Sequence, residues 1–142
     1  EDATSLTGIL SFPRDLTLLD VAVIQAVAGD VKTAVRTADR VAEALRDNTY
    51  RKMVGILVKK REWTGAHEVM NKMKKDWVVD EASHRMFQGL TRTEAGAGFS
   101  NQAQEWASMQ QVGIARAFAL LGVAEGLMER AGVEQLFPVV RP

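Results

Sequence analysis

Residues 47–66 read DNTYRKMVGILVKKREWTGA, and residues 15–34 read DLTLLDVAVIQAVAGDVKTA. The two stretches align without a gap, so that Thr17 matches Thr49 and Ala34 matches Ala66. Apolar residues recur in both at the spacing of one helix face, not in the alternation of a strand. We therefore predict two copies of one helical hairpin, because self-similarity at a fixed period is the signature of a repeat protein.

A third copy is expected to begin at Ser83, about one repeat length after Thr49. Its second helix contains Ala103, which lies further from Ala66 than Ser83 lies from Thr49, so we expect an insertion in the loop at residues 96–98. Antiparallel helices approach closely only where side chains are small. This assigns Ala34, Ala66 and Ala103 to the packing positions of the three repeats.

Helical periodicity and turn residues together divide the chain into seven predicted helices. Gly29-Asp30 predicts a boundary, because glycine takes the left-handed cap and aspartate accepts from the free amides of the next helix. Further starts are expected at residues 47–49 and 80–83, and further breaks at residues 96–101 and at Gly132. The expected helices are 16–28, 30–44, 48–60, 62–76, 81–95, 100–111 and 113–131.

Each hairpin leaves one apolar face bare, so the next hairpin must stack on it. The predicted fold class is all-α: a short right-handed α-solenoid of about three helix-turn-helix repeats plus a terminal helix, in one domain over residues 15–131. Residues 1–14 are expected to be an N-terminal extension, and residues 132–142 a tail that lies across the last helix or on a partner. The last helix is apolar on more than one side, which indicates that the tail or another protein covers its outer face.

Composition and motifs argue against catalysis. The chain has no cysteine, which removes thiolate metal sites and cysteine nucleophiles. His67-Glu68-Val69-Met70-Asn71 lacks the second histidine of the zinc-protease helix, and Gly96-Ala97-Gly98 lacks the third glycine of a dinucleotide loop. No stretch reaches the roughly 20 apolar residues of a transmembrane helix. We therefore expect that the protein is not an enzyme, that it binds no cofactor and no metal, and that it contacts a membrane only through partners.

Charge is unevenly distributed along a chain whose net charge is zero. Residues 51–75 hold eight basic and two acidic residues, whereas residues 1–50 carry a net charge of −3. A basic middle could steer an anionic partner, or it could be the solvated face of two surface helices. The candidate surface for RNA, another anion or a protein partner consists of Arg51, Lys52, Lys59, Lys60, Arg61, Lys72, Lys74 and Lys75.

Two tryptophans are candidate docking residues. Trp63 lies at the start of a predicted second helix, where packing between hairpins is the favoured interpretation. Trp77 lies beside Val78-Val79 in a predicted turn between repeats, where an exposed docking spot and a core position are equally compatible with the pattern.

The residues from Thr49-Tyr50 through Ala66 and Met73-Lys74 to Asp80 resemble a pentatricopeptide repeat. That family has a Thr-Tyr helix start, an alanine in the second helix, a Met-Lys near its end and a closing aspartate. The resemblance extends over about residues 15–111, and the tetratricopeptide repeat, with its 34-residue unit, is a close alternative. The pentatricopeptide resemblance implies import into a mitochondrion or plastid and binding of single-stranded RNA, one base per repeat.

By this resemblance the base-reading position maps to Leu19, Arg51 and Arg85. The family usually places Asn, Thr or Ser there, and leucine cannot make the paired hydrogen bonds that identify a base. Such repeats can lose RNA reading and persist as scaffolds. We therefore expect a non-catalytic accessory subunit that binds other protein subunits of a larger organellar complex. A single-stranded RNA-binding module is the alternative function, and the bacterial periplasm is the alternative location.

Overall fold

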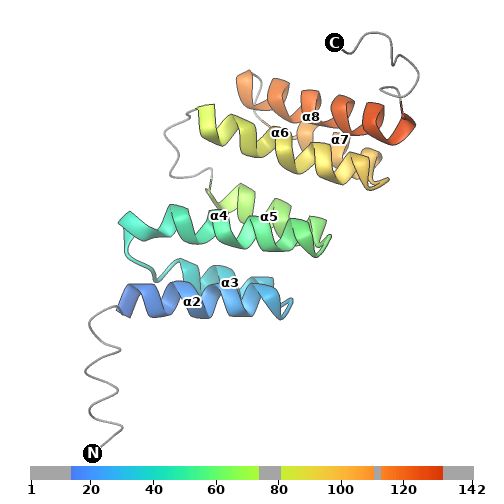
Figure 1. Ribbon diagram of the computed structural model, residues 1–142. Helices are drawn as coiled ribbons and strands as arrows, with labels where there is room; N and C mark the ends of the chain where they lie inside the picture. Colours follow the sequence, from blue (N-terminus) through green and yellow to red (C-terminus); the bar gives the residue numbers. More distant parts are fainter. Residues whose placement is uncertain (1–13, 74–80, 111–112, 133–142) are drawn as a thin grey trace, which may run out of the picture. The chain divides into compact units, whose positions relative to one another are not determined.

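The computed structural model describes residues 14–73, 81–110 and 113–132. In these residues the chain forms helices only, which confirms the predicted all-α class (Figure 1). The predicted extension and tail lie largely outside the described residues, as do Lys74, Lys75 and Trp77. The seven described helices are α2 (Arg14–Val27), α3 (Val31–Ala38), α4 (Glu43–Lys59), α5 (Trp63–Met73), α6 (Glu81–Gly96), α7 (Ser100–Ser108) and α8 (Ile114–Ala131).

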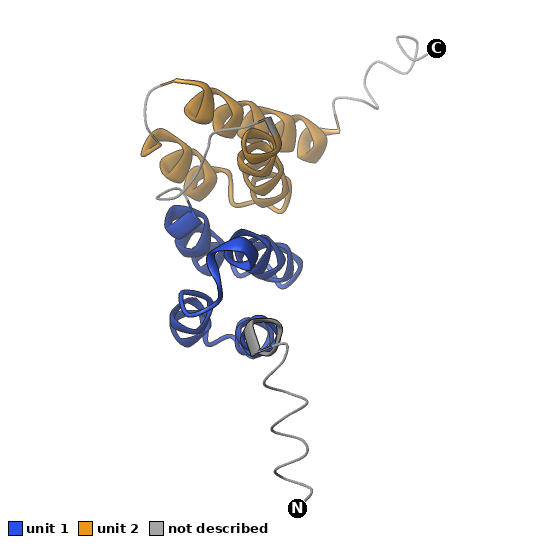
Figure 2. Cartoon of the chain, turned by 90° about the vertical axis from the view of Figure 1, so that its left-hand side faces the viewer, with its two compact units in different colours: residues 1–75 blue, residues 76–142 orange. Residues whose placement is uncertain are grey.

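The chain divides into two compact units, residues 1–75 and residues 76–142 (Figure 2). In the first unit, α2 packs on α3 and α4, and α4 packs on α5. In the second unit, α6 packs on α7 and, most extensively, on α8. Adjacent helices therefore pair within each unit, while a single repeat domain over residues 15–131 stays a prediction.

The hairpins α2–α3, α4–α5 and α6–α7 are closed by the same three-residue turn. The last residue of each turn donates its backbone N–H to the carbonyl oxygen five residues earlier, at 3.0, 2.8 and 3.1 Å in chain order. This is the longer hydrogen bond of the Schellman motif, which requires a left-handed residue just before it. The left-handed residues are Gly29 (φ 89°), Arg61 (φ 59°) and Gly98 (φ 102°).

The three predicted packing alanines share one position after these turns. Each donates its backbone N–H to the carbonyl oxygen of the last turn residue, and each is fully buried. In the first hairpin that turn residue is Asp30, whose carboxylate also accepts from the Thr33 N–H at 3.2 Å, so the predicted boundary at Gly29-Asp30 is confirmed. The alanine bonds are Ala34 to Asp30 (3.0 Å), Ala66 to Glu62 (2.9 Å) and Ala103 to Phe99 (3.0 Å).

The predicted helices over 30–44 and 48–60 are wrong at their shared boundary. α3 ends at Ala38 and α4 begins at Glu43, so residues 47–49 lie inside a helix. There Thr49 donates its hydroxyl to the carbonyl oxygen of Leu45 at 2.8 Å and caps nothing. Val41 follows Ala34 by seven residues, so the helical spacing of apolar residues continues past the end of α3, although Val41 is a buried residue of the connection between the two helices.

The insertion expected at residues 96–98 is also wrong. The turns 60–62 and 97–99 have equal length. The number of residues from the end of α4 to the end of α6 equals the number from the start of α5 to the start of α7, so the loop itself contains no additional residue. The additional residues therefore precede α6. Ser83 is consequently not the equivalent of Thr49.

Candidate partner-binding surfaces

Helix α8 lies against α6 at a separation that only glycine permits. A Cβ atom at Gly122 would lie 2.2 Å from the Gln88 carbonyl oxygen and 2.2 Å from Thr91 Oγ1. At Gly126 it would lie 2.3 Å from the Arg92 carbonyl oxygen. Since no side chain fits at either position, the two glycines fix which side of α8 faces α6. This glycine pair was not predicted, because its only signal in the sequence is a spacing of four residues within a helix.

Helices α6 and α8 run in the same direction. At both ends of their contact, a residue of α6 meets the residue of α8 that lies the same number of positions further along the chain. The rings of His84 and Phe118 stack with centroids 5.1 Å apart, near the start of each helix. Further along, Arg92 meets Gly126 at the same offset in sequence. This offset equals the unit length of a tetratricopeptide repeat.

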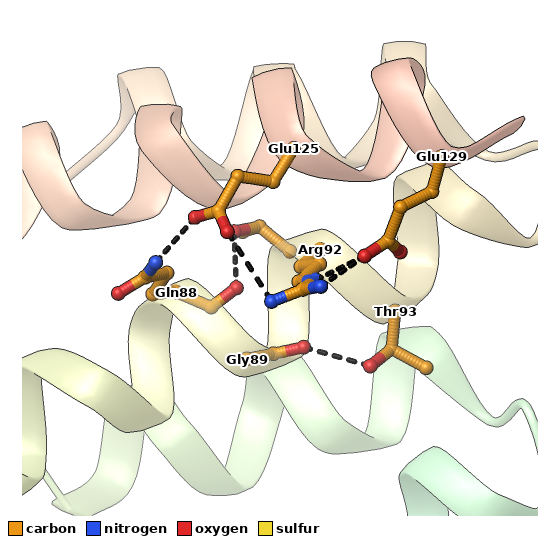
Figure 3. Close-up of polar contacts among 7 residues, drawn as sticks. Gln88, Gly89, Arg92, Thr93, Glu125 and Glu129 are labelled. Atoms are coloured by element: carbon orange, nitrogen blue, oxygen red, sulfur yellow. Dashed lines mark hydrogen bonds and ion pairs between the residues drawn. The ribbon is translucent and has the colours of Figure 1, made fainter. Parts of the chain in front are cut away.

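A polar network joins the edges of α6 and α8 (Figure 3). Arg92 donates from Nε to Glu129 Oε1 at 2.7 Å and from Nη1 to Glu125 Oε2 at 3.2 Å, and Gln88 Nε2 donates to Glu125 Oε1. These side chains are partly exposed, so each ion pair contributes little to stability. The glycines allow the two helices to pack closely, and the polar network specifies their register.

The start of α8 is also anchored, in this case to the end of α7. Near its start, Arg116 donates to the carbonyl oxygens of Gln110 (3.0 Å) and Ser108 (2.8 Å), just beyond and at the end of α7. The predicted break at Gly132 is confirmed, since α8 ends at Ala131 and Gly132 is left-handed with φ 68°. The contacts with α6 and α7 therefore determine the rotation of α8 about its own axis.

The face of α8 opposite α6 is apolar and exposed. Its most exposed large residues are Ile114 (61%), Met128 (52%) and Leu121 (49%), whereas the side toward α6 buries only Ala119, Gly122, Val123 and Gly126. The helix thus buries both of its glycines and exposes its leucines, Ile114 and Met128. We call the α8 stripe the six exposed residues spaced alternately three and four apart: Ile114, Ala117, Leu121, Ala124, Met128 and Ala131.

A second exposed apolar face lies on α2. Val21, Ile24 and Val27 are exposed there, opposite a buried side that includes Ala22 and Ala26. It has three exposed large apolar residues, whereas α8 has five: Ile114, Leu120, Leu121, Leu127 and Met128. We therefore take the α8 stripe as the principal candidate for binding a partner.

The predicted basic surface divides into separate parts. Lys59 ends α4, and Lys60 and Arg61 follow it in the turn, where cations complement the negative end of the helix. Lys60 donates to the carbonyl oxygen of Val27. Lys52 is exposed on α4, more than a turn away from Lys59.

The other two described members of this surface pair with carboxylates. Arg51 Nε lies 2.6 Å from Asp47 Oδ2, within α4. Lys72 lies in the last turn of α5, the far end of the hairpin from Arg61, and its Nζ is 3.1 Å from Asp39 Oδ2. These pairs partly neutralise the basic charge that the sequence placed in one segment.

Two other predicted recognition residues lie in the interior. Trp63 is buried at the start of α5, and Leu19, the first base-reading position of the pentatricopeptide resemblance, is buried on α2. Arg85 is exposed on α6. The two histidines, His67 and His84, are both buried.

The described ranges hold no group of three or more His, Asp or Glu residues placed to bind a metal ion. Within those ranges, too, no helix combines the length and apolar character needed to cross a bilayer. Comparison of the chain with models of known protein families, with curated proteins and with solved structures found no match.

Proposed function

We propose that this chain is a non-catalytic helical-repeat scaffold, an accessory subunit that binds protein through the α8 stripe. The observation that carries the proposal is the orientation of α8, with Ile114, Leu121 and Met128 exposed and glycines buried. A contiguous exposed apolar face on a rigid element is typical of a protein interface. Large side chains at the centre of such a face supply most of its binding energy.

The shared turns support a repeat architecture for this scaffold. Three hairpins have the same left-handed middle residue, and each is followed by a buried alanine at the same position. α8 lies one repeat length beyond α6 in the sequence. These features favour a short right-handed α-solenoid of the pentatricopeptide or tetratricopeptide kind, with α8 as the first helix of a further unit. The pentatricopeptide resemblance supports a mitochondrion or plastid as its location.

Single-stranded RNA binding is the second candidate, favoured by Lys59, Lys60 and Arg61 at one hairpin turn. The burial of Leu19 and the ion pair of Arg51 weigh against base reading. RNA binding would fall steeply with added salt, because phosphate contacts release counterions. Binding through the α8 stripe would change little with salt, because the stripe carries no charge.

The proposal is tested by capturing partners with three forms of the full chain: wild type, Leu121→Glu and Gln104→Glu. The last adds the same charge at an exposed position of α7, outside the stripe. A captured protein is then purified and titrated against each form. We expect binding to wild type and to Gln104→Glu and none to Leu121→Glu. Equal binding to all three forms, or salt-sensitive RNA binding alone, would overturn the proposal.

A further inference from the structure

We infer that the α8 stripe binds a second copy of this chain, with the two α8 helices antiparallel. The inference rests on the proposed function, because it names the protein that the stripe binds. Its starting point is the alternation along the stripe, where every large residue is followed by an alanine. Spacing of three and four residues is that of a left-handed helix pair, which packs side chains into the gaps of the facing helix.

Reversing one copy makes the stripe complementary to itself. A two-fold axis between Leu121 and Ala124 places Leu121 of each copy opposite Ala124 of the other. The same axis places Ile114 opposite Ala131 and Met128 opposite Ala117. Every layer then contains one large and one small side chain, so the layers are equal in volume and the helices can approach closely along their whole length.

A parallel pair lacks this complementarity. In register, it would place Leu121 against Leu121 and Ala124 against Ala124, so crowded layers would alternate with gaps. Gaps in a buried interface lose van der Waals contact and are destabilising. The alternation of residue sizes therefore selects the antiparallel arrangement.

Charge contributes little to this choice, because most of the charged side chains of α8 are already engaged within one chain. Glu125 and Glu129 pair with Arg92, and Arg116 donates to the carbonyl oxygens of Gln110 and Ser108. The helix dipoles make a small favourable contribution to an antiparallel pair and an unfavourable one to a parallel pair.

The area available indicates a reversible dimer. An 18-residue helix is about 27 Å long and about 12 Å in diameter with its side chains, so half of its curved surface is roughly 500 Å², and two facing helices bury on the order of 1,000 Å² in total. This is near the lower limit for a specific protein interface. We therefore expect a dissociation constant on the order of 10 µM, so that the monomer predominates in dilute solution.

Sedimentation equilibrium of the full chain and of swapped variants tests the inference. Leu121→Ala and Ala124→Leu should each weaken the wild-type dimer about tenfold or more, the first by leaving a gap and the second by crowding. The double variant, Leu121→Ala with Ala124→Leu, restores one large and one small residue in each layer and should recover most of the affinity. Because both positions are exposed, none of these changes should impair folding.

Cross-linking establishes the orientation, since the chain has no cysteine of its own. A mixture of the Ala117→Cys and Met128→Cys variants should be joined efficiently by a short bismaleimide. Ala117→Cys alone should not be joined, because the two copies of this position lie about 16 Å apart along an antiparallel pair. Efficient joining of Ala117→Cys alone would mean a parallel pair and would overturn the inference.

The remaining outcomes separate this inference from the proposed function. A chain that stays monomeric at about 500 µM, well above the expected dissociation constant, contradicts the second-copy partner. If it then dimerises when shortened to end at Gly132, the C-terminal tail covers the stripe, and the inference fails. If the monomer binds a different protein in a Leu121-dependent manner, the inference fails and the proposed function stands. If Leu121→Glu alters neither dimerisation nor the binding of another protein, both the inference and the proposed function fail.

Discussion

The position that a Cβ atom would take on Gly122 lies 2.2 Å from the carbonyl oxygen of Gln88. That oxygen belongs to the backbone of α6, so it cannot rotate away as a side chain could. The orientation of α8, and with it the exposure of Leu121, thus depends on glycine at one buried position.

Gly122→Ala should destabilise the second unit by about 2 kcal/mol or more, because the added methyl group forces two helix backbones apart. Urea unfolding followed by circular dichroism gives the free energy. Gly89→Ala is the matched control on α6, since its Cβ would meet nothing within 4 Å. It should stabilise the protein by about 0.5–1 kcal/mol through helix propensity alone. Equal effects of the two changes would contradict the close helix contact.

Arg61→Gly should stabilise the first unit by about 0.5–1 kcal/mol, because a non-glycine residue is strained in the left-handed region. Arg61 has a φ of 59° where the other two hairpins have glycine. Thermal unfolding measures the gain. Arg61→Ala removes the same charge but keeps the strain, so it should not increase the stability. A gain in the alanine variant would assign the effect to charge.

Asp30 should give the first unit a pH-dependent contribution. Hydrogen bonds from the Thr33 side chain and backbone hold the pKa of this carboxyl below its ordinary value of 3.8. The ionised form is therefore favoured by folding: its contribution is complete above the unfolded-state pKa and is lost as pH falls through the lower folded-state pKa. Asp30→Asn keeps a capping oxygen without titrating. The advantage of wild type over this variant should shrink on acidification, and a constant difference in unfolding free energy would contradict it.

Two neighbouring residues of α6 should respond differently to substitution. Arg92→Ala removes partly exposed ion pairs to Glu125 and Glu129, so it should cost less than about 1 kcal/mol, and less still in high salt. Thr91→Val removes a buried hydroxyl that donates to the Ala119 carbonyl oxygen at 2.7 Å, and should cost about 1–3 kcal/mol at any salt concentration. Unfolding in low and high salt distinguishes them, and a salt-independent loss for Arg92→Ala would contradict this ranking.

The helices and the turns at Gly29 and Gly98 were predictable from the sequence. Glycine readily adopts the left-handed conformation that these turns require, so the residue type alone marks them. The predicted break between the helices 48–60 and 62–76 is also confirmed, but no glycine marks its turn, because Arg61 adopts a left-handed conformation that arginine rarely takes. Val41 repeats a helical spacing although it lies outside a helix, so periodicity misplaced the boundary between α3 and α4.

The candidate surface was only partly predictable. The pattern of α8 indicates apolar residues on more than one side, but it does not say which side is buried. Hydrophobicity alone would bury Leu121, whereas the structure buries Gly122 and Gly126 because α6 offers backbone at close range there. The signal is the spacing of the two glycines, but that spacing does not specify which helix packs against them.

The rate of thiol labelling at positions 121 and 123 tests the orientation of α8 most directly. In dilute solution the Leu121→Cys variant should react nearly as fast as a Gln104→Cys control, and more slowly as the protein concentration rises. The Val123→Cys variant, at a position only 5% exposed, should be strongly protected at every concentration. Fast reaction of Val123→Cys together with slow reaction of Leu121→Cys in dilute solution would show that α8 presents its other side.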